Sequence, residues 1–342
     1  MRAFEMASIS LEVVPCLLCG SPRHGVFLKD VPELYVGTGH LFDIVKCSGC
    51  GFTFTNPRPC KKDIGMFYPD SSGYYANKAG SDDITGRFSG ISGALKRLVL
   101  ARVFGYRHLF PSAFWIPAWA LRPLLCFGGD PDMPQYRAGG RLFEIGCSTG
   151  GYLKKMETLG WHVSGVELNA AAADFARDKL GLPGVRQGFF EDQALADGSF
   201  EVVKASMVLE HVYDPRDFVK HVARVLVPGG DFIFSVPDID GLEIRWYGRH
   251  AYCLQVPQHI SHFSVRTVTA LLEQEGFEVV RVRHHSFDRD LVASANYAGR
   301  KTLAAILHHR VIRKLLVAPF VGLLAALGKT SRMTVYARKA AR

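Results

Sequence analysis

Residues 141–153 read RLFEIGCSTGGYL, and this stretch decides the fold. Its first five residues are mostly apolar and predict a buried strand, and a helix is predicted over residues 150–159. Between them lies a turn that contains Gly146, Gly150 and Gly151. Glycine lets a backbone turn tightly and approach a ligand, and the start of the next helix offers unpaired N–H groups. The stretch therefore predicts a ligand site at the carboxyl end of the strand.

The alternation of strands and helices continues along the chain. Further strands are predicted at 162–168, 200–205, 231–236, 277–282 and 333–338. Helices are predicted over 170–180 and 214–226, and from a capping Ser264 to Gly276, and a turn at 228–230 is expected just before the 231–236 strand. Repeated βα units predict an α/β fold, with a doubly wound, mostly parallel sheet and helices on both faces.

The second predicted strand ends at Glu167, seventeen residues after Gly150. A carboxylate at this position can accept hydrogen bonds from both hydroxyls of a ribose. Two features favour S-adenosylmethionine over a dinucleotide as the ligand. Glu144 precedes the first glycine of the turn, and the third glycine of the dinucleotide-binding GxGxxG pattern is missing.

Residues 141–282 resemble the class I S-adenosylmethionine-dependent methyltransferases. The matching blocks are 142–153, 165–168, 197–203, 208–215 and 224–230. The resemblance implies a Rossmann-like, seven-stranded methyltransferase domain. Three departures stand out: Ser148 occupies a position where glycine is commonest, Glu201 stands where aspartate is usual, and residues 188–191 lack the aspartate that often meets the adenine. The cofactor contacts it implies are Glu144, Gly146, Ser148, Gly150, Glu167, Leu168, and Phe189 or Phe190 with backbone groups for the adenine.

Four cysteines form two CxxCG pairs separated by 27 residues: Cys16, Cys19, Cys47 and Cys50. Two such turns can bring four thiolates to one tetrahedral Zn²⁺, which predicts a zinc-ribbon-like module over residues 10–60. Because four protein ligands leave no open position, the zinc is expected to be structural. The alternative is a disulfide-stapled module, which suits an intracellular chain poorly. The other cysteines are expected to be free, mostly buried thiols: Cys60, Cys126, Cys147 and Cys253.

The formal charge of +9, from 41 basic and 32 acidic residues, is unevenly distributed. Residues 84–129 contain six basic residues and no acidic one, and residues 291–342 contain ten and none. Both segments are also rich in apolar residues, which favours helices on an anionic membrane surface, with solvated helical caps as the alternative. No secretory signal or good membrane-spanning run is found. We expect a cytoplasmic protein, peripheral at the inner face of the cell membrane if these segments bind lipid.

Composition shifts divide the chain into three predicted parts. The module at 10–60 is followed by a linker and basic-apolar helical segment at 61–135, and then by the methyltransferase domain at 136–342 with a helical insertion at about 290–330. A CxxC…CxxC module with a trailing NPRP at 56–59 resembles bacterial proteins associated with surface-polysaccharide, glycolipid or modified-sugar synthesis. The resemblance implies a sugar, glycolipid or lipid-linked glycan precursor as the methyl acceptor.

Three histidines are candidates for the base that takes a proton from the acceptor. His259 and His262 follow the fifth predicted strand and His211 follows the fourth, and ligands of such sheets bind at this carboxyl edge. His259 is favoured. The alternatives are that His262 packs and caps the next helix, and that His211 orders its loop. Candidate substrate contacts, or ordinary loop residues, lie just upstream: Tyr247, Arg249 and Tyr252.

Two other function classes are compatible with parts of the sequence. An RNA methyltransferase that uses the zinc ribbon for recognition would suit the net charge. However, residues 15–59 hold only four basic against three acidic residues, and the Asn/Asp-Pro-Pro-Tyr/Phe motif of base amino methylases is absent. Nucleic acid is therefore the less favoured partner. A non-catalytic adaptor is disfavoured because Glu144, Gly146, Gly150 and Glu167 are all present.

Overall fold

The computed structural model describes residues 9–68, 90–109 and 132–341, and the chain divides into two compact units. We call the first the cysteine unit; it comprises residues 1–69, 207–220 and 235–335. The second, the glycine-turn unit, comprises residues 70–206, 221–234 and 336–342. Cys126 and most of the first basic-apolar segment lie outside the described residues.

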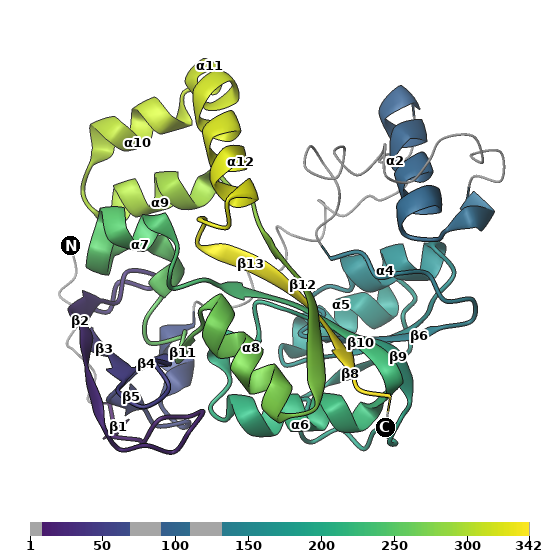
Figure 1. Ribbon diagram of the computed structural model, residues 1–342, viewed down its shortest axis with the longest axis horizontal. Helices are drawn as coiled ribbons and strands as arrows, with labels where there is room; N and C mark the ends of the chain where they lie inside the picture. The colour runs from purple at the N-terminus through teal and green to yellow at the C-terminus, as the bar shows by residue number, and fades with distance from the viewer. Residues whose placement is uncertain (1–8, 69–89, 110–131, 342) are drawn as a thin grey trace. The chain divides into compact units, whose positions relative to one another are not determined.

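The main sheet has seven strands in the order β12-β13-β10-β9-β6-β7-β8 (Figure 1). Strand β6 pairs in parallel with both β7 and β9, and β7 pairs in parallel with β8. This order confirms the predicted doubly wound, mostly parallel sheet. Its strands are β6 (Arg141–Ile145), β7 (His162–Glu167), β8 (Val185–Gln187), β9 (Phe200–Ser206), β10 (Leu226–Pro237), β12 (Phe277–His284) and β13 (Arg332–Lys339).

One expected strand boundary is wrong. Strand β10 begins at Leu226, whereas the sequence predicts a strand from residue 231 preceded by a turn at 228–230. Gly229 has a φ of +72°, a conformation that glycine adopts without strain, so the irregular backbone at this point is accommodated inside the strand. The helix before it, α6 (Pro215–Val225), ends correspondingly early.

Helices α4 (Gly151–Thr158) and α5 (Ala170–Asp178) contact β7 within the glycine-turn unit (Figure 1). Leu153 and Met156 are three residues apart on α4, so both lie on the face that is buried in the core with Leu142 and Trp161. Asn169 caps α5 by accepting a hydrogen bond from the Ala172 N–H. The unit also contains α2 (Gly90–Val103) and the 3₁₀ turn η3 (Arg107–Leu109).

The cysteine unit contains two small antiparallel sheets. One has the strand order β11-β4-β3-β2, and the other pairs β1 with β5. Because Ser261 pairs with Phe54 and His262 with Thr53, the histidine-containing segment adds a strand to the sheet of the predicted zinc module. These strands are β1 (Leu11–Glu12), β2 (His24–Pro32), β3 (Leu41–Cys47), β4 (Thr53–Thr55), β5 (Arg58–Pro59) and β11 (Ser261–His262).

Most helices of the cysteine unit follow β10 or lie between β12 and β13 (Figure 1). As predicted, Ser264 caps α8, through a capping box with Thr267. No helix in the described parts of the chain is both long and apolar enough to cross a membrane. The helices are α7 (Leu242–Tyr247), α8 (Val265–Gln274), α9 (Arg289–Tyr297), α10 (Lys301–His308), α11 (Arg310–Ile312) and α12 (Ala318–Ala326), with the π-helical η9 (Arg313–Val317) and 3₁₀ turns η1 (Ile64–Phe67), η6 (Leu209–His211), η7 (Gly248–His250) and η8 (Tyr252–Leu254).

Candidate functional site

The glycine-rich turn after β6 depends on left-handed backbone conformations. Gly150 has a φ of +83°, and a Cβ at this position would lie 2.7 Å from Leu182 Cδ1. A larger residue would therefore be both strained and crowded. Ser148 also adopts a positive φ, +51°, which explains why glycine is commoner at its position. The turn keeps this shape because Glu167 holds it from the neighbouring strand.

Glu167 lies at the end of β7, and both of its carboxylate oxygens accept backbone hydrogen bonds. The Ser148 N–H donates to Oε2 over 2.8 Å, and the Asn169 N–H donates to Oε1, also over 2.8 Å. Each carboxylate oxygen has a second lone pair that these bonds leave available. Glu167 can therefore accept two further hydrogen bonds, such as those from a pair of neighbouring hydroxyls.

A second group of charged side chains lies beside the turn. Lys204 donates to Glu144 Oε1 over 2.8 Å and lies 3.8 Å from Asp132 Oδ2. Burial raises the pKa of Glu144, and the Lys204 ammonium opposes that shift. Glu144 Oε2 is buried and has no hydrogen-bond partner in the described residues. Two carboxyl groups therefore lie around one ammonium, and Glu167 is near enough to add to the rise in the pKa of Glu144, an excess of acidic groups that suits a positively charged ligand.

The two phenylalanines after β8 have different environments. Phe190 is only 4% exposed and its ring lies 6.0 Å from that of Phe143, so it belongs to the core. Phe189 is 59% exposed, and the neighbouring Leu168 is also exposed. Of the two rings expected to meet an adenine, Phe189 is therefore the one that is available to a ligand.

The three candidate histidines gather in the cysteine unit. The rings of His211 and His259 are 4.8 Å apart and nearly perpendicular. His211 Nδ1 bonds to the Gln258 carbonyl and to Tyr68 Oη, and His259 Nδ1 bonds to the Cys253 carbonyl. A ring nitrogen that faces a carbonyl oxygen must carry the proton, so Nε2 of both rings is an acceptor in the neutral form.

His262 is placed differently from the other two. It is buried on β11, and its Nε2 bonds to Thr55 Oγ1 over 3.1 Å. Burial lowers the pKa of His262 to about 3 and that of His211 to about 4, and it lowers the pKa of His259 strongly. All three imidazoles are therefore neutral at pH 7. His211, which is partly exposed, is the most accessible proton acceptor of the three.

Glu210 is a feature of this cluster that the sequence analysis missed. It is fully buried, and neither carboxyl oxygen has a hydrogen-bond partner among the described residues. One of these oxygens lies within 4.8 Å of a ring nitrogen of His211 and of a ring nitrogen of His259. Burial raises the pKa of Glu210 to about 8 despite the influence of Arg332. The sequence signal was its position directly before His211 in the 208–215 block.

Glu210→Gln is expected to change the pH dependence of stability. The folded protein keeps a proton on this carboxyl up to about pH 8, whereas the unfolded chain releases it near pH 4.5. Stability contributed by the site is thus fully present below pH 4.5 and is lost as the pH rises towards 8. Glutamine does not titrate. Relative to the wild type, the variant should gain on the order of 2–4 kcal/mol in free energy of unfolding between pH 5.5 and 8.

Urea denaturation of both proteins across this pH range measures the difference. The control is Glu157→Gln, which alters an exposed carboxyl on α4. If wild type and Glu210→Gln lost stability in parallel from pH 5.5 to 8, the buried carboxyl would not be protonated in the folded protein.

The four paired cysteines meet at one point of the cysteine unit. Their sulfur atoms lie within 4.8 Å of one another, with Cys16 and Cys50 Sγ 3.5 Å apart and Cys19 and Cys47 Sγ 3.6 Å apart. Tetrahedral coordination with Zn–S bonds of about 2.3 Å requires sulfur separations of about 3.8 Å. The donor set and its spacing therefore fit a zinc ion.

The remaining predicted residues are distributed over the cysteine unit and the core. Cys147 and Cys253 are buried free thiols, and Cys60 is a partly buried one. Arg249 is exposed and donates a long hydrogen bond to the Asp30 carbonyl. Tyr252 packs beside Tyr297, with ring centroids 5.7 Å apart. Tyr247 is buried and lines an apolar pocket, so it is not a simple loop residue.

Comparison with known families tests the resemblance stated above. Residues 126–282 match the model of a methyltransferase domain. The match spans the glycine-rich turn, Glu167, and the segment with His211, His259 and His262. This part of the chain is therefore similar to methyltransferase domains and carries the Rossmann-like sheet described above. S-adenosylmethionine is the cofactor that such a domain implies.

Two curated relatives are similar over the same region. A probable S-adenosylmethionine-dependent methyltransferase of Mycolicibacterium smegmatis is 31% identical over 145 residues, which cover 42% of this chain and 54% of the relative. A ubiquinone biosynthesis O-methyltransferase of Thiobacillus denitrificans is 34% identical over 135 residues, covering 38% and 57%. The chain thus spans little more than half the length of these relatives.

Among solved structures, an S-adenosylmethionine-dependent methyltransferase from Mesorhizobium loti is similar with 20% identity and a TM-score of 0.42. The similarity covers 65% of this chain and 97% of that structure.

Proposed function

We propose that this protein is an S-adenosylmethionine-dependent methyltransferase that acts on a sugar, a glycolipid or a lipid-linked glycan precursor. The observation that carries the proposal is Glu167, held at the end of β7 beside the glycine-rich turn, in a segment that matches methyltransferase domains. When bound, S-adenosylmethionine supplies a methyl group on a positively charged sulfur, ready for displacement by a nucleophile.

The residues of the glycine-turn unit fit this cofactor. Glu167 retains the lone pairs needed for two ribose hydroxyls, and Phe189 offers an exposed ring for the adenine. Asp132 and Glu144, whose Oε2 has no hydrogen-bond partner among the described residues, supply negative charge for a ligand with ammonium and sulfonium groups. Gly150 keeps the turn free of a side chain, so backbone N–H groups can approach the ligand closely.

The histidine pair is proposed to handle the acceptor proton. His211 Nε2 takes the proton from an acceptor hydroxyl, and His259 lies beside it as a second neutral imidazole. Their low pKa values keep both rings unprotonated and therefore able to accept a proton at physiological pH. Because His262 already bonds to Thr55, we assign it a role in holding β11 in place.

We propose a structural zinc at Cys16, Cys19, Cys47 and Cys50. Four thiolates at suitable spacing support this assignment, and four protein ligands leave no position for substrate. The metal would fix the two turns on either side of β2 and β3. The module would then present β4 as a stable partner for β11.

Binding of S-adenosylmethionine tests the proposed cofactor site. Glu167→Ala removes one hydrogen bond to the turn, one to the Asn169 N–H and the acceptor for the ribose, so the dissociation constant of S-adenosylmethionine should rise by about ten- to a hundredfold in calorimetry. Glu157→Ala, which removes an exposed carboxylate from α4, should leave it unchanged. Equal affinity of the wild type and Glu167→Ala would contradict this site, and no binding to the wild type would refute the enzyme.

The acceptor class is tested separately. Methyl-labelled S-adenosylmethionine is incubated with the protein and with cell extract, which is then separated into lipid, glycan and RNA fractions. Label in the lipid or glycan fraction supports the proposal, and label in RNA alone would overturn it in favour of an RNA methyltransferase.

A further inference from the structure

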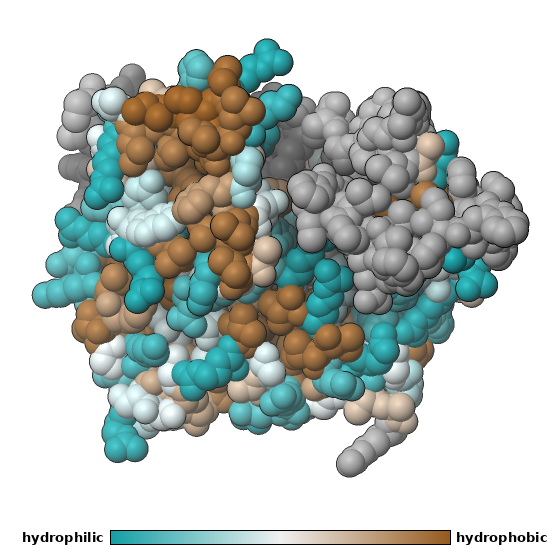
Figure 2. Space-filling model, turned by 45° about the horizontal axis from the view of Figure 1, so that its top comes forward, coloured by the Kyte–Doolittle hydropathy of each residue, from teal (hydrophilic) through white to brown (hydrophobic). Residues whose placement is uncertain are grey.

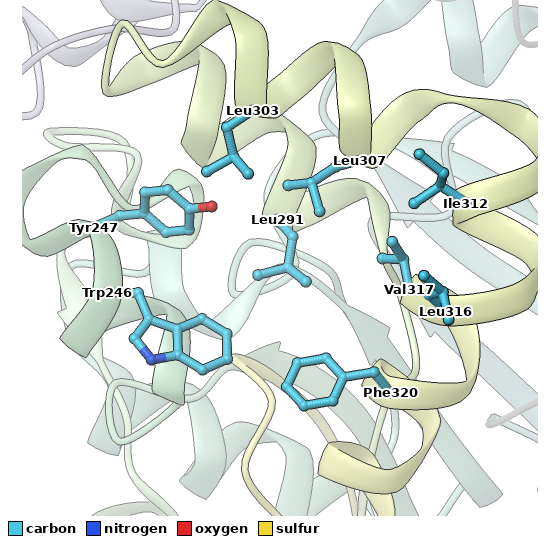
Figure 3. A pocket seen from close by; sticks show the side chains of 9 residues that line it. All are labelled: Trp246, Tyr247, Leu291, Leu303, Leu307, Ile312, Leu316, Val317 and Phe320. Atoms are coloured by element: carbon cyan, nitrogen blue, oxygen red, sulfur yellow. The ribbon is translucent and has the colours of Figure 1, made fainter.

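An apolar pocket lies among the helices of the cysteine unit (Figure 3). Its volume is about 470 Å³, within the range typical of sites for small organic ligands. The lining side chains come from four places: Trp246 and Tyr247 on α7, Leu291 on α9, Leu303 and Leu307 on α10, and the segment from α11 to α12. Figure 3 shows these side chains converging on one shared hollow.

Every residue that lines the pocket is aliphatic or aromatic. Leu316 and Phe320 approach from the η9–α12 side, and the Phe320 ring stacks with Trp246 at a centroid distance of 6.2 Å. The Tyr247 hydroxyl is the one polar group that points into the hollow in Figure 3. A ligand for this pocket must therefore be a hydrocarbon over most of its length.

The apolar surface continues outside the pocket. Leu316 is 66% exposed, and Leu315, Phe320, Leu323 and Leu327 are also exposed on the same segment. Figure 2 shows the corresponding hydrophobic area over the helices at the upper left, with hydrophilic atoms at its border. Exposed apolar clusters of this kind mark contact sites for lipid or protein.

Basic side chains lie on the α10–α12 side of the pocket, whereas the acidic Glu243 and Asp290 lie on α7 and α9. Residues 291–341 contain no acidic side chain, and Arg310 and Lys314 are exposed beside the lining segment. The Arg300 guanidinium lies 5.6 Å from the centroid of the ring of Tyr247, which lines the pocket. Within the described ranges, Arg300 makes no ion pair. A cation beside a lining residue of a hydrocarbon-lined hollow is complementary to a ligand with an apolar chain and an anionic head.

We propose that this pocket binds the hydrocarbon chain of a lipid with an anionic head group, and that this lipid anchors the methyl acceptor. The hydrocarbon chain of the lipid lies between α7, α10 and η9, and Arg300 pairs with the anionic head group. The second part of the proposal rests on the proposed function and narrows its acceptor to the lipid-linked class. The basic-apolar segment predicted from residues 291–342 then serves one lipid molecule and not only a membrane surface.

The probes are dodecyl phosphate and dodecanol, each kept below the concentration at which it aggregates, with binding to the full chain followed by calorimetry. We expect saturable binding of one dodecyl phosphate per chain. Leu316→Glu places a carboxylate in the pocket lining and should weaken binding by about tenfold or more. Because Leu316 is largely exposed, the variant should fold.

Two further variants separate the pocket from its surface. Leu323→Glu makes the same chemical change at a residue of α12 that is 58% exposed and does not line the pocket. The affinity of this variant for dodecyl phosphate should therefore stay within about twofold of the wild-type value. Arg300→Ala should weaken the binding of dodecyl phosphate by about tenfold and leave the binding of dodecanol unchanged. Both outcomes support a pocket that binds the hydrocarbon chain, with Arg300 beside it for the anionic head group.

Three results would overturn the proposal: no saturable binding of dodecyl phosphate, equal losses in Leu316→Glu and Leu323→Glu, or binding only to a third probe, vesicles of anionic phosphatidylglycerol. The last two would indicate contact with a membrane surface. S-adenosylmethionine affinity is measured on the same samples. If the wild-type protein binds S-adenosylmethionine but not dodecyl phosphate, only the lipid pocket is refuted. If it binds dodecyl phosphate but not S-adenosylmethionine, only the proposed enzymatic function is refuted.

Discussion

Cys16→Ser is expected to reduce bound zinc from about one ion per chain to nearly none and to unfold the sheet formed by β2, β3 and β4. The Cys16 thiol is 2% exposed and lies 3.5 Å from that of Cys50, so a hydroxyl in its place leaves an incomplete, buried metal site. Structural zinc contributes about 10–16 kcal/mol in small zinc modules, far more than the margin by which most domains are stable.

Elemental analysis of the purified protein gives the zinc content, and hydrogen exchange of residues 24–55 gives the state of the sheet. Cys60→Ser is the matched control because this thiol is free and outside the four-sulfur cluster, and it should retain full zinc. Unchanged zinc in Cys16→Ser would exclude this ligand. Four thiols that fail to react in the denatured, unreduced protein would favour the disulfide-stapled alternative.

The consequence of zinc loss should extend beyond the module. β11 pairs with β4 through Ser261 and His262, and the Thr55 hydroxyl donates to the His259 carbonyl. Disorder in β4 therefore removes two supports of the histidine segment. The zinc-depleted protein should lose turnover to about the same extent as a variant that lacks the proposed base.

His211→Ala is expected to lower kcat by about 10²–10⁴-fold while the dissociation constant of S-adenosylmethionine stays within about twofold. The imidazole is proposed to take the acceptor proton, a role that the small alanine side chain cannot fill. His259→Ala should also lower kcat, because its ring packs 4.8 Å from that of His211 and its loss leaves the proposed base without that neighbour. His309→Ala, at an exposed histidine after α10, is the control.

The pH profile distinguishes a base from a structural histidine. Because burial lowers the pKa of His211 to about 4, the wild-type rate should remain nearly constant from pH 8 down to about 5 and fall only as the pH approaches 4. An inflection near 6.5 would indicate an exposed imidazole and contradict this assignment. Normal turnover in both His211→Ala and His259→Ala would remove the histidine pair from the mechanism.

The parts of the site that depend on spacing along the chain can be predicted from the sequence. The glycine-rich turn, the acid that follows it after one helix and the paired CxxCG turns all have fixed separations along the chain. The structure places Glu167 against the turn and the four thiols together, as those separations require. The alternation of strands and helices likewise predicts the sheet, because each βα unit has its own hydrophobic period.

Features that depend on packing between distant segments could not be predicted in this way. Phe189 and Phe190 are adjacent and chemically identical, and which one is buried depends on packing against residues distant in sequence, such as Phe143 beside Phe190. The burial of Glu210 results from the segments that surround it, and its sequence neighbours give no sign of it. Tyr247 lines a pocket because helices more than fifty residues later in the chain fold over it.

The pairing of β11 with β4 also sets an order of events during synthesis. Residues 53–54 leave the ribosome roughly two hundred residues before their partners at 261–262. Until then, β4 presents an open edge with unpaired backbone groups, which can associate with other nascent chains. If the first fifty residues bind the metal early, the edge strand β4 would stay ordered while the rest of the chain is translated. Availability of the metal during translation would then influence the yield of correctly assembled protein as well as its final stability.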